Sequence, residues 1–301
     1  MNPDFVQKLN TMRPNAPRTI ALAAADDAAA LSACAIARDM GFAHTKLFGP
    51  KNAIEQIADK NKIDMTNFEI TDITSEHDST TAAVKSVRDG RADILMKGHT
   101  HTADILRAVL NKETGIRGPG KLSHVSVLYS PALNRTLMMT DVGMVMYPDL
   151  ATKVALINNA VAVAHKLGIQ NPAVVPLAAV ETINPAMQAT LDADALTKMN
   201  QNGEITGCRV FGPLAFDGAV SESAARIKGI KSDIAGHADI LVFHNIEAAN
   251  STVKSLTIFG GFIFGGIVVG ARAPIVINSR SDSDMSKMFS IALACKMSNQ
   301  R

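Results

Sequence analysis

Short runs of apolar residues alternate along the chain with longer stretches in which apolar residues recur every three or four positions. The runs at 19–25 (TIALAAA), 92–96 (ADILM) and 240–243 (ILVF) have the length and composition of buried strands. The stretches at 103–110 and 148–167 have the periodicity of helices. A repeated strand–helix order predicts parallel strands joined by right-handed crossovers, and therefore an α/β fold.

The stretch IVVGARAPIVINSRSDSDMS (267–286) brings a strand, a polar pair and a helix close together. A short buried strand precedes Ser279 and Arg280, and an amphipathic helix follows them. This is where parallel α/β sheets bind ligands and where free backbone N–H groups attract anions. A guanidinium can also bind a phosphate through two hydrogen bonds. The stretch is equally compatible with Asp282 or Ser283 as a helix cap and Arg280 as a surface charge.

The turn KGHTHT (97–102) follows the strand that ends at Met96. If this strand and the strand before Ser279 share a sheet, both ends lie at the same edge. Lys97 and Thr102 are then candidate phosphate ligands. His99 and His101 are close in sequence, but a catalytic metal needs three protein ligands, and no third is apparent. We therefore expect no metal site.

The overall charge gives no reason to expect a nucleic acid or an anionic membrane as partner. The net charge is +2, from 30 basic and 28 acidic residues, and no strongly basic segment stands out. The three cysteines are widely separated and suggest neither zinc nor a disulfide framework, so we expect a reducing, cytoplasmic compartment. Residues 1–18 lack the apolar segment of a signal peptide. The uncharged run at 255–271 carries five glycines and is read as a helix end plus a strand, not as a membrane span.

Seven phrases between Ala92 and Lys296 occur in the order found in one enzyme family. On these phrases the chain resembles the phosphate acetyl/butyryltransferase family, most closely its phosphate butyryltransferase branch. The phrases are ADILMKG with Thr102, LSHVSV, TDVGMVMYPDL, AAVETINPAMQATLDA, GCRVFGPLAFDGAVS, GHADILVFHNIEAANSTVKSL and GGIVVGARAPIVINSRSDS.

The resemblance implies two α/β domains of mainly parallel sheets, flanked by helices around an interdomain cleft, as in isocitrate and isopropylmalate dehydrogenases. It implies that the C-terminal helix returns to the first domain, so the expected domains are 1–149 with 269–301, and 150–268. The implied reaction converts acyl-CoA and inorganic phosphate to acyl phosphate and CoA, with butyryl or acetyl as the short acyl group. The coenzyme A thioester is then a substrate, no cofactor is permanently bound, and the enzyme is a homodimer or a larger homo-oligomer.

The family's Ser-Arg pair corresponds here to Ser279 and Arg280, which the resemblance implies as the clamp that holds phosphate beside the thioester. The acetyl branch carries an aspartate six places after the arginine, but this chain has Ser286 there. Asp282 and Asp284 are the nearest carboxylates, so either is a candidate base. Both are also explained as acidic residues that favour a helix amino end.

Other candidates match the family's phrases less specifically. Asn250 is a candidate donor to the tetrahedral oxyanion. Asp217 is a candidate cleft residue or a cap of the following helix. Arg107 is a candidate ligand of the CoA phosphates or a solvated helix charge. Thr182 and Asn184 match a phrase near the family's phosphate site, although an ordinary turn also explains Asn-Pro.

Two departures from the family leave an alternative open. His244 replaces a proline and Ala249 replaces a glycine in the phrase HNIEAAN. We interpret His244 as an inert substitution in preference to a new acid/base group. Together with Ser286, these changes are also compatible with a retuned or inactive relative that binds CoA or acyl phosphate. A decarboxylating dehydrogenase on a similar scaffold is disfavoured, because neither its metal-binding carboxylates nor its nucleotide site is apparent.

Overall fold

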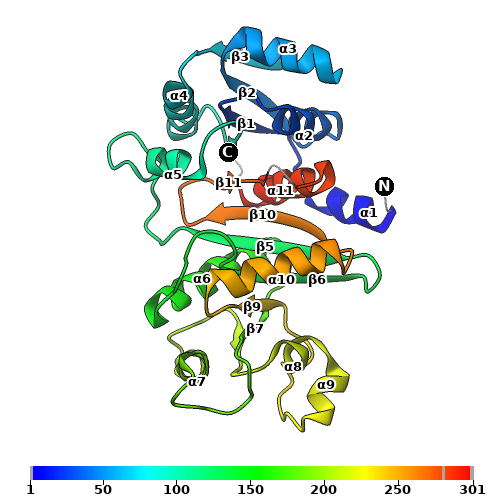
Figure 1. The fold of residues 1–301 in the computed structure, drawn as a ribbon, viewed down its shortest axis with the longest axis vertical. Coiled ribbons are helices and arrows are strands. Elements are labelled where there is room, and N and C mark those ends of the chain that lie inside the picture. The colour runs from blue at the N-terminus through cyan, green and yellow to red at the C-terminus, as the bar shows by residue number, and fades with distance from the viewer. Residues whose placement is uncertain (1–2, 280–281, 299–301) are drawn as a thin grey trace. The chain divides into compact units, whose positions relative to one another are not determined.

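The computed structural model describes residues 3–279 and 282–298 of the 301-residue chain, which folds into two compact units (Figure 1). Unit 1 comprises Met1–Leu122 and Gly265–Arg301, and unit 2 comprises Ser123–Phe264. The first boundary, expected at 149/150, lies at 122/123 in this division. The reason is that strand β6 (Arg135–Thr140) pairs with β9 (Ile240–Val242), which belongs to unit 2.

The sheet of unit 1 is mainly parallel. Its strands follow the order β3 (Phe68–Asp72), β2 (Ala43–Gly49), β1 (Arg18–Ala23), β4 (Ile94–Lys97), β11 (Ile275–Val276) and β10 (Ile263–Val269). All neighbouring pairs from β3 to β11 are parallel, whereas β10 and β11 are antiparallel. Val276 pairs in register with Met96, so the chain leaves β4 and β11 at the same edge of the sheet.

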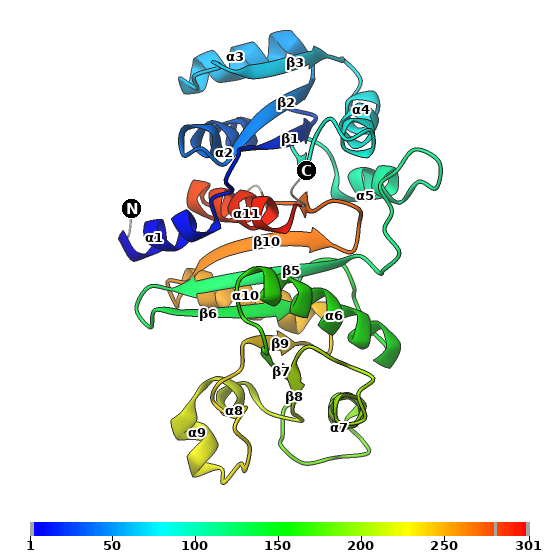
Figure 2. The ribbon, with the colours of Figure 1, turned by 180° about the vertical axis from the view of Figure 1, so that it is seen from behind.

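Helices cover both faces of this sheet. On one face α2 (Ala28–Asp39) contacts α3 (Lys51–Asn61) and α11 (Asp284–Met297), and α11 contacts α1 (Pro3–Met12). On the other face α4 (Glu76–Arg88) contacts α5 (Thr102–Leu110) (Figures 1 and 2). Strands β1 and β4 read as mostly apolar runs because both of their faces are buried, and α11 is buried along most of its length.

The sheet strands of unit 2 run in mixed directions. The hairpin β5 (Ser123–Ser130) and β6 is antiparallel, and β6 continues through β9 and β7 (Ala173–Pro176) to β8 (Arg209–Val210) in parallel. Its helices are α6 (Leu150–Lys166), α7 (Gln188–Gln201), α8 (Phe216–Val220), α9 (Glu222–Ile227) and α10 (Ile246–Ile258). Helices α6 and α10 lie on opposite faces of this sheet (Figures 1 and 2).

The predicted α/β class is confirmed, and its strands lie close to their expected positions. The run at 255–271 forms the end of α10 and strand β10, as expected. Helix α1 and the antiparallel direction of β5 and β6 were not predicted from the sequence. Among the described helices, none has both the length and the apolar character needed to cross a bilayer.

Candidate functional site

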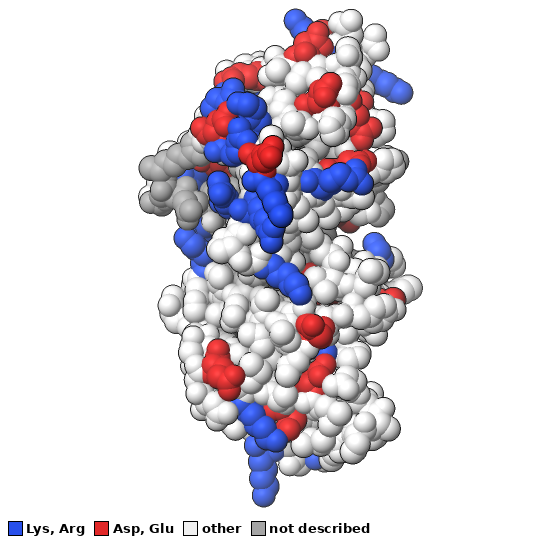
Figure 3. Space-filling model, turned by 90° about the vertical axis from the view of Figure 1, so that its left-hand side faces the viewer, with Lys and Arg blue, Asp and Glu red and all other residues white. Residues whose placement is uncertain are grey.

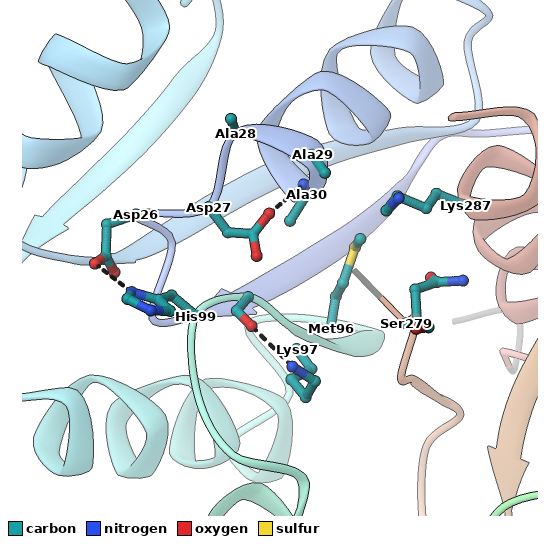
Figure 4. A pocket seen from close by; sticks show the side chains of 12 residues that line it. Asp26, Asp27, Ala28, Ala29, Ala30, Met96, Lys97, His99, Ser279 and Lys287 are labelled. Carbon is teal, nitrogen blue, oxygen red and sulfur yellow. Dashed lines mark hydrogen bonds and ion pairs between the residues drawn. The ribbon is translucent and has the colours of Figure 1, made fainter. Parts of the chain in front are cut away.

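A cavity of about 340 Å³ lies in unit 1 at the edge where β4 and β11 end (Figure 4). We call it the lysine cavity, because two lysines line it. Its lining residues come from the start of α2, the turn after β4, the chain after β11 and the first turns of α11: Asp26, Asp27, Ala28, Ala29, Ala30, Met96, Lys97, Gly98, His99, Asn278, Ser279 and Lys287.

The amino end of α2 contributes backbone donors to the lysine cavity. Asp27 caps this helix, and its carboxylate accepts a hydrogen bond of 2.9 Å from the backbone N–H of Ala30. The N–H groups of Ala28 and Ala29 also belong to the first turn, where no carbonyl of the same helix is available. Such a helix end favours an anion. The carboxylate of Asp27 lowers this preference.

The two lysines bring positive charge to the same place. The ammonium group of Lys97 donates hydrogen bonds to the carbonyl oxygens of Gly98 (3.1 Å) and Thr100 (2.9 Å). Lys287 is only 4% exposed, and its ammonium group donates to the backbone carbonyl oxygen of Asp282. Within the described part of the chain, this partner is a neutral carbonyl and not a carboxylate. A buried ammonium without a counter-charge is costly, and an anion in the cavity would provide one.

A small hydrogen-bond network shapes the strand end that carries Ser279. The backbone N–H of Ser279 donates to the carboxylate of Asp282 at 2.8 Å, and the N–H of Asp282 donates back to the Ser279 carbonyl oxygen at 3.1 Å. The amide of Asn278 donates to the hydroxyl of Ser290 at 3.1 Å. The carboxylate of Asp282 therefore holds the strand end at Ser279, and of the two residues proposed as the cap of α11 it is Ser283 that caps the helix.

The other candidate residues of this stretch are Arg280, Asp284 and Ser283. Arg280 lies outside the described residues. Asp284 is the exposed first residue of α11, and Ser283 caps that helix by accepting a hydrogen bond from the backbone N–H of Ser286 at 3.1 Å. Ser286 itself is buried, so the position of the family's acid holds a small hydroxyl.

Two expected phosphate ligands in unit 1 lie outside the lysine cavity. Thr102 is the exposed first residue of α5. Arg107 is paired with Asp104 at 2.5 Å and lines a separate cavity of about 190 Å³ with His77, Thr81 and Asn111. Of the expected residues in unit 1, the structure therefore brings together Lys97 and Ser279.

The expected residues of unit 2 have structural partners. The amide of Asn250 donates a long hydrogen bond of 3.4 Å to the carbonyl oxygen of Val142. Asp217 lies in α8 and is paired at 2.7 Å with Lys228, whose hydrogen bond lowers the pKa of that carboxyl. Thr182 is exposed, and no described contact assigns it a role.

Asn184 forms the turn that its Asn-Pro sequence suggested. Its side chain accepts a hydrogen bond of 2.9 Å from the backbone N–H of Ala186, and its own N–H donates to the hydroxyl of Thr190 at 2.9 Å.

Lys287 was not predicted from the sequence. It lies beside the apolar positions that define α11, so periodicity alone hides it. A signal was nevertheless present, because a lysine near the amino end of a helix opposes the helix dipole.

Lysine and arginine side chains also gather on one face of unit 1 (Figure 3).

A family model described as phosphate acetyl/butaryl transferase matches residues 74–295. The phosphate butyryltransferase of Clostridium beijerinckii is 44% identical over 294 residues, which cover 98% of this chain and 97% of that protein. A branched-chain phosphotransacylase from Enterococcus faecalis V583 has a similar structure, with a TM-score of 0.83 at 32% identity over 93% of this chain and 98% of the other. The 4-hydroxythreonine-4-phosphate dehydrogenase of Klebsiella pneumoniae shares the fold alone, with a TM-score of 0.56 at 13% identity over 93% of this chain and 99% of the other.

Proposed function

Because the chain belongs to the phosphate acetyl/butaryl transferase family, we propose that it transfers a short acyl group between coenzyme A and inorganic phosphate. In this reaction a phosphate oxygen attacks the thioester carbonyl carbon. A C–O bond forms, the C–S bond breaks, and the CoA thiolate leaves and takes up a proton. Butyryl is the favoured acyl group, since the Clostridium beijerinckii relative is a phosphate butyryltransferase.

The observation that carries this proposal for the chain itself is the lysine cavity. Lys97, the buried Lys287 and the amino end of α2 converge on one space of about 340 Å³. That combination suits a small, multiply charged anion such as inorganic phosphate. Ser279 lines the same space, and we propose that Arg280 adds the guanidinium that its sequence position suggested.

The proposed acyl transfer needs little help from a basic side chain of the protein. A thiol titrates at about pH 8.5, so the thiolate is a good leaving group near neutral pH. Inorganic phosphate is already an anion there. Holding this nucleophile in place beside the thioester is therefore the larger contribution. We propose that Asp282 or Asp284 assists proton transfer, and that Asn250 donates to the oxyanion.

A thiol-release assay tests the proposal. Wild-type protein is mixed with butyryl-CoA and phosphate, and free CoA is detected with a chromogenic thiol reagent. The three cysteines of the chain are buried, and burial raises the pKa of Cys34 and Cys295 to about 12 and that of Cys208 to about 11, so the signal reports CoA. We expect release that depends on phosphate. No release from acetyl-, propionyl- or butyryl-CoA would contradict the proposal.

The buried Ser286 favours a second candidate function, a relative that binds CoA or acyl phosphate without turnover. Calorimetric binding of CoA in the absence of thiol release distinguishes this candidate from the first. We also propose that the protein acts as a homodimer or larger homo-oligomer in the cytoplasm, without a permanently bound cofactor. Sedimentation of the purified protein tests the assembly state.

A further inference from the structure

A cluster of three polar side chains, of which Lys153 and Asp192 are buried and His244 is partly exposed, lies in unit 2, outside the lysine cavity. Lys153 on α6 is 3% exposed, and its ammonium group contacts the carboxylate of Asp192 on α7 at 2.5 Å. The same ammonium donates to Nδ1 of His244, at the end of β9, at 2.9 Å. The proposed reaction uses none of these groups.

The cluster fixes which nitrogen of His244 carries the proton. An ammonium group has three donors and no acceptor, so Nδ1 must accept from Lys153. In a neutral imidazole the proton then resides on Nε2. Burial and, next, the charge of Lys153 lower the pKa of His244, against a smaller opposite effect of Asp192. The ring is therefore neutral at pH 7 and presents Nε2–H as a donor.

His244 lines a cavity of about 720 Å³ whose other walls are mainly apolar. Leu177, Met187, Phe216, Phe243 and Leu256 supply large apolar surfaces, and the remaining lining residues are alanines, serines and a threonine. None of these described lining residues is an aspartate, glutamate, lysine or arginine. The cavity therefore disfavours a phosphate or a diphosphate and suits an uncharged alkyl group.

We propose that this cavity binds the short acyl chain of the substrate, with the acyl carbonyl oxygen accepting a hydrogen bond from Nε2–H of His244. Alkyl carbons then contact the apolar walls, and the neutral imidazole donor orients the carbonyl group. Lys153 is a positioning residue, since it holds the imidazole in the donating tautomer. The identity of the ligand as an acyl group rests on the proposed function, whereas the tautomer and the apolar walls do not.

The first measurement concerns His244 alone. In protein labelled with nitrogen-15 in histidine, the shifts of the two ring nitrogens report which one is protonated. We expect the Nε2–H tautomer at pH 7. A proton on Nδ1, or a charged ring at that pH, overturns the proposal.

The second measurement compares two uncharged probes that differ in the carbonyl group, the butyryl thioester of N-acetylcysteamine and its S-butyl thioether. Each probe is titrated into the protein, and its dissociation constant is obtained from the change in the nitrogen-15 shifts of the His244 ring. One neutral hydrogen bond contributes about 0.5–1.5 kcal/mol, so the thioester should bind about 2- to 12-fold more tightly than the thioether. In His244→Phe, followed through backbone amide signals, this difference should disappear, and in His244→Gln, which retains a donor, part of it should remain.

His237→Phe is the matched control, because His237 also lies in unit 2 but faces Glu222, at 3.5 Å, and not this cavity. It should behave like wild type. Equal binding of the two probes to wild type, or no binding of either, overturns the inference even where CoA release is intact. Conversely, absence of CoA release with a preserved thioester preference contradicts the proposed function and leaves this site standing as a binding site.

Discussion

The ammonium group of Lys287 donates a hydrogen bond to the carbonyl oxygen of Asp282, which holds a buried positive charge near the amino end of α11. This position is unfavourable for a lysine, because the helix dipole is positive there as well. An anion in the lysine cavity would be attracted both by the ammonium group of Lys287 and by the helix dipole, and would so offset their mutual repulsion. Lys287 is therefore better explained by binding than by stability.

Replacement of Lys287 by methionine tests this interpretation. A hydrogen bond to a charged group contributes about 1.5–3 kcal/mol, so the KM for phosphate should rise about 12- to 160-fold. The free energy of unfolding in urea should stay the same or increase, since a buried charge is removed. Lys296→Met, in the last turn of the same helix, is the control and should leave the KM unchanged. A loss of stability without a change in KM would assign Lys287 a purely structural role.

Asp27 should weaken anion binding, because its carboxylate lines the lysine cavity while it caps α2. Asp27→Asn keeps a capping side chain and removes the charge. We expect a lower KM for phosphate and a free energy of unfolding within about 0.5 kcal/mol of wild type. Steady-state kinetics at low and high salt measure the effect, which should shrink as salt increases. An unchanged or higher KM at low salt would count against an anion in this cavity.

The buried pair Lys153–Asp192 should dominate the stability of its region in unit 2. Asp192→Ala leaves the buried ammonium of Lys153 without its carboxylate and should lower the free energy of unfolding by about 3–5 kcal/mol. Asp194→Ala is the matched control on the same helix, since its partner Lys198 is exposed and the pair should contribute less than about 1 kcal/mol. The double variant Lys153→Met/Asp192→Leu should recover much of the loss. Urea denaturation of the four proteins decides the point, and equal losses for the two single variants would contradict it.

The lowered pKa of His244 predicts a pH dependence of stability. The unfolded chain binds a proton at this histidine near pH 6.5. The folded chain binds it at lower pH, because the ring is partly buried and lies beside Lys153, which Asp192 compensates only in part. Protonation therefore favours unfolding, and stability falls as the pH decreases below about 6.5. His244→Gln should lose less stability than wild type between about pH 7 and pH 5. If the free energy of unfolding fell equally with pH in the two proteins, the pKa of His244 would not be lowered in the folded state.

The sequence was most informative where local pattern and sheet topology agree. Strand-like runs followed by polar turns predicted that Lys97 and Ser279 would reach one sheet edge, and the pairing of Val276 with Met96 confirms this. Lys287 was missed because its burial depends on how α11 packs against α2, which periodicity does not encode. The antiparallel hairpin of β5 and β6 was missed for a similar reason, since buried strands of either direction read as apolar runs.

Residues chosen by family phrases were harder to place. Asn184 lies in the turn that was foreseen as its structural alternative. Asp217 was foreseen as a cap of the following helix, but it pairs with Lys228, and Ser221 caps α9 instead. Their roles toward a substrate stay predictions. His244 was interpreted as inert because a single histidine carries little information in a sequence. Its contact with Lys153, 91 positions earlier in the chain, exists only in the folded protein.

A crystal structure of the protein soaked with inorganic phosphate tests the central claim most directly. The account predicts phosphate in the lysine cavity, with oxygen atoms within hydrogen-bonding distance of the ammonium groups of Lys97 and Lys287. Phosphate bound elsewhere, with the lysine cavity containing only water at saturating phosphate, would contradict it.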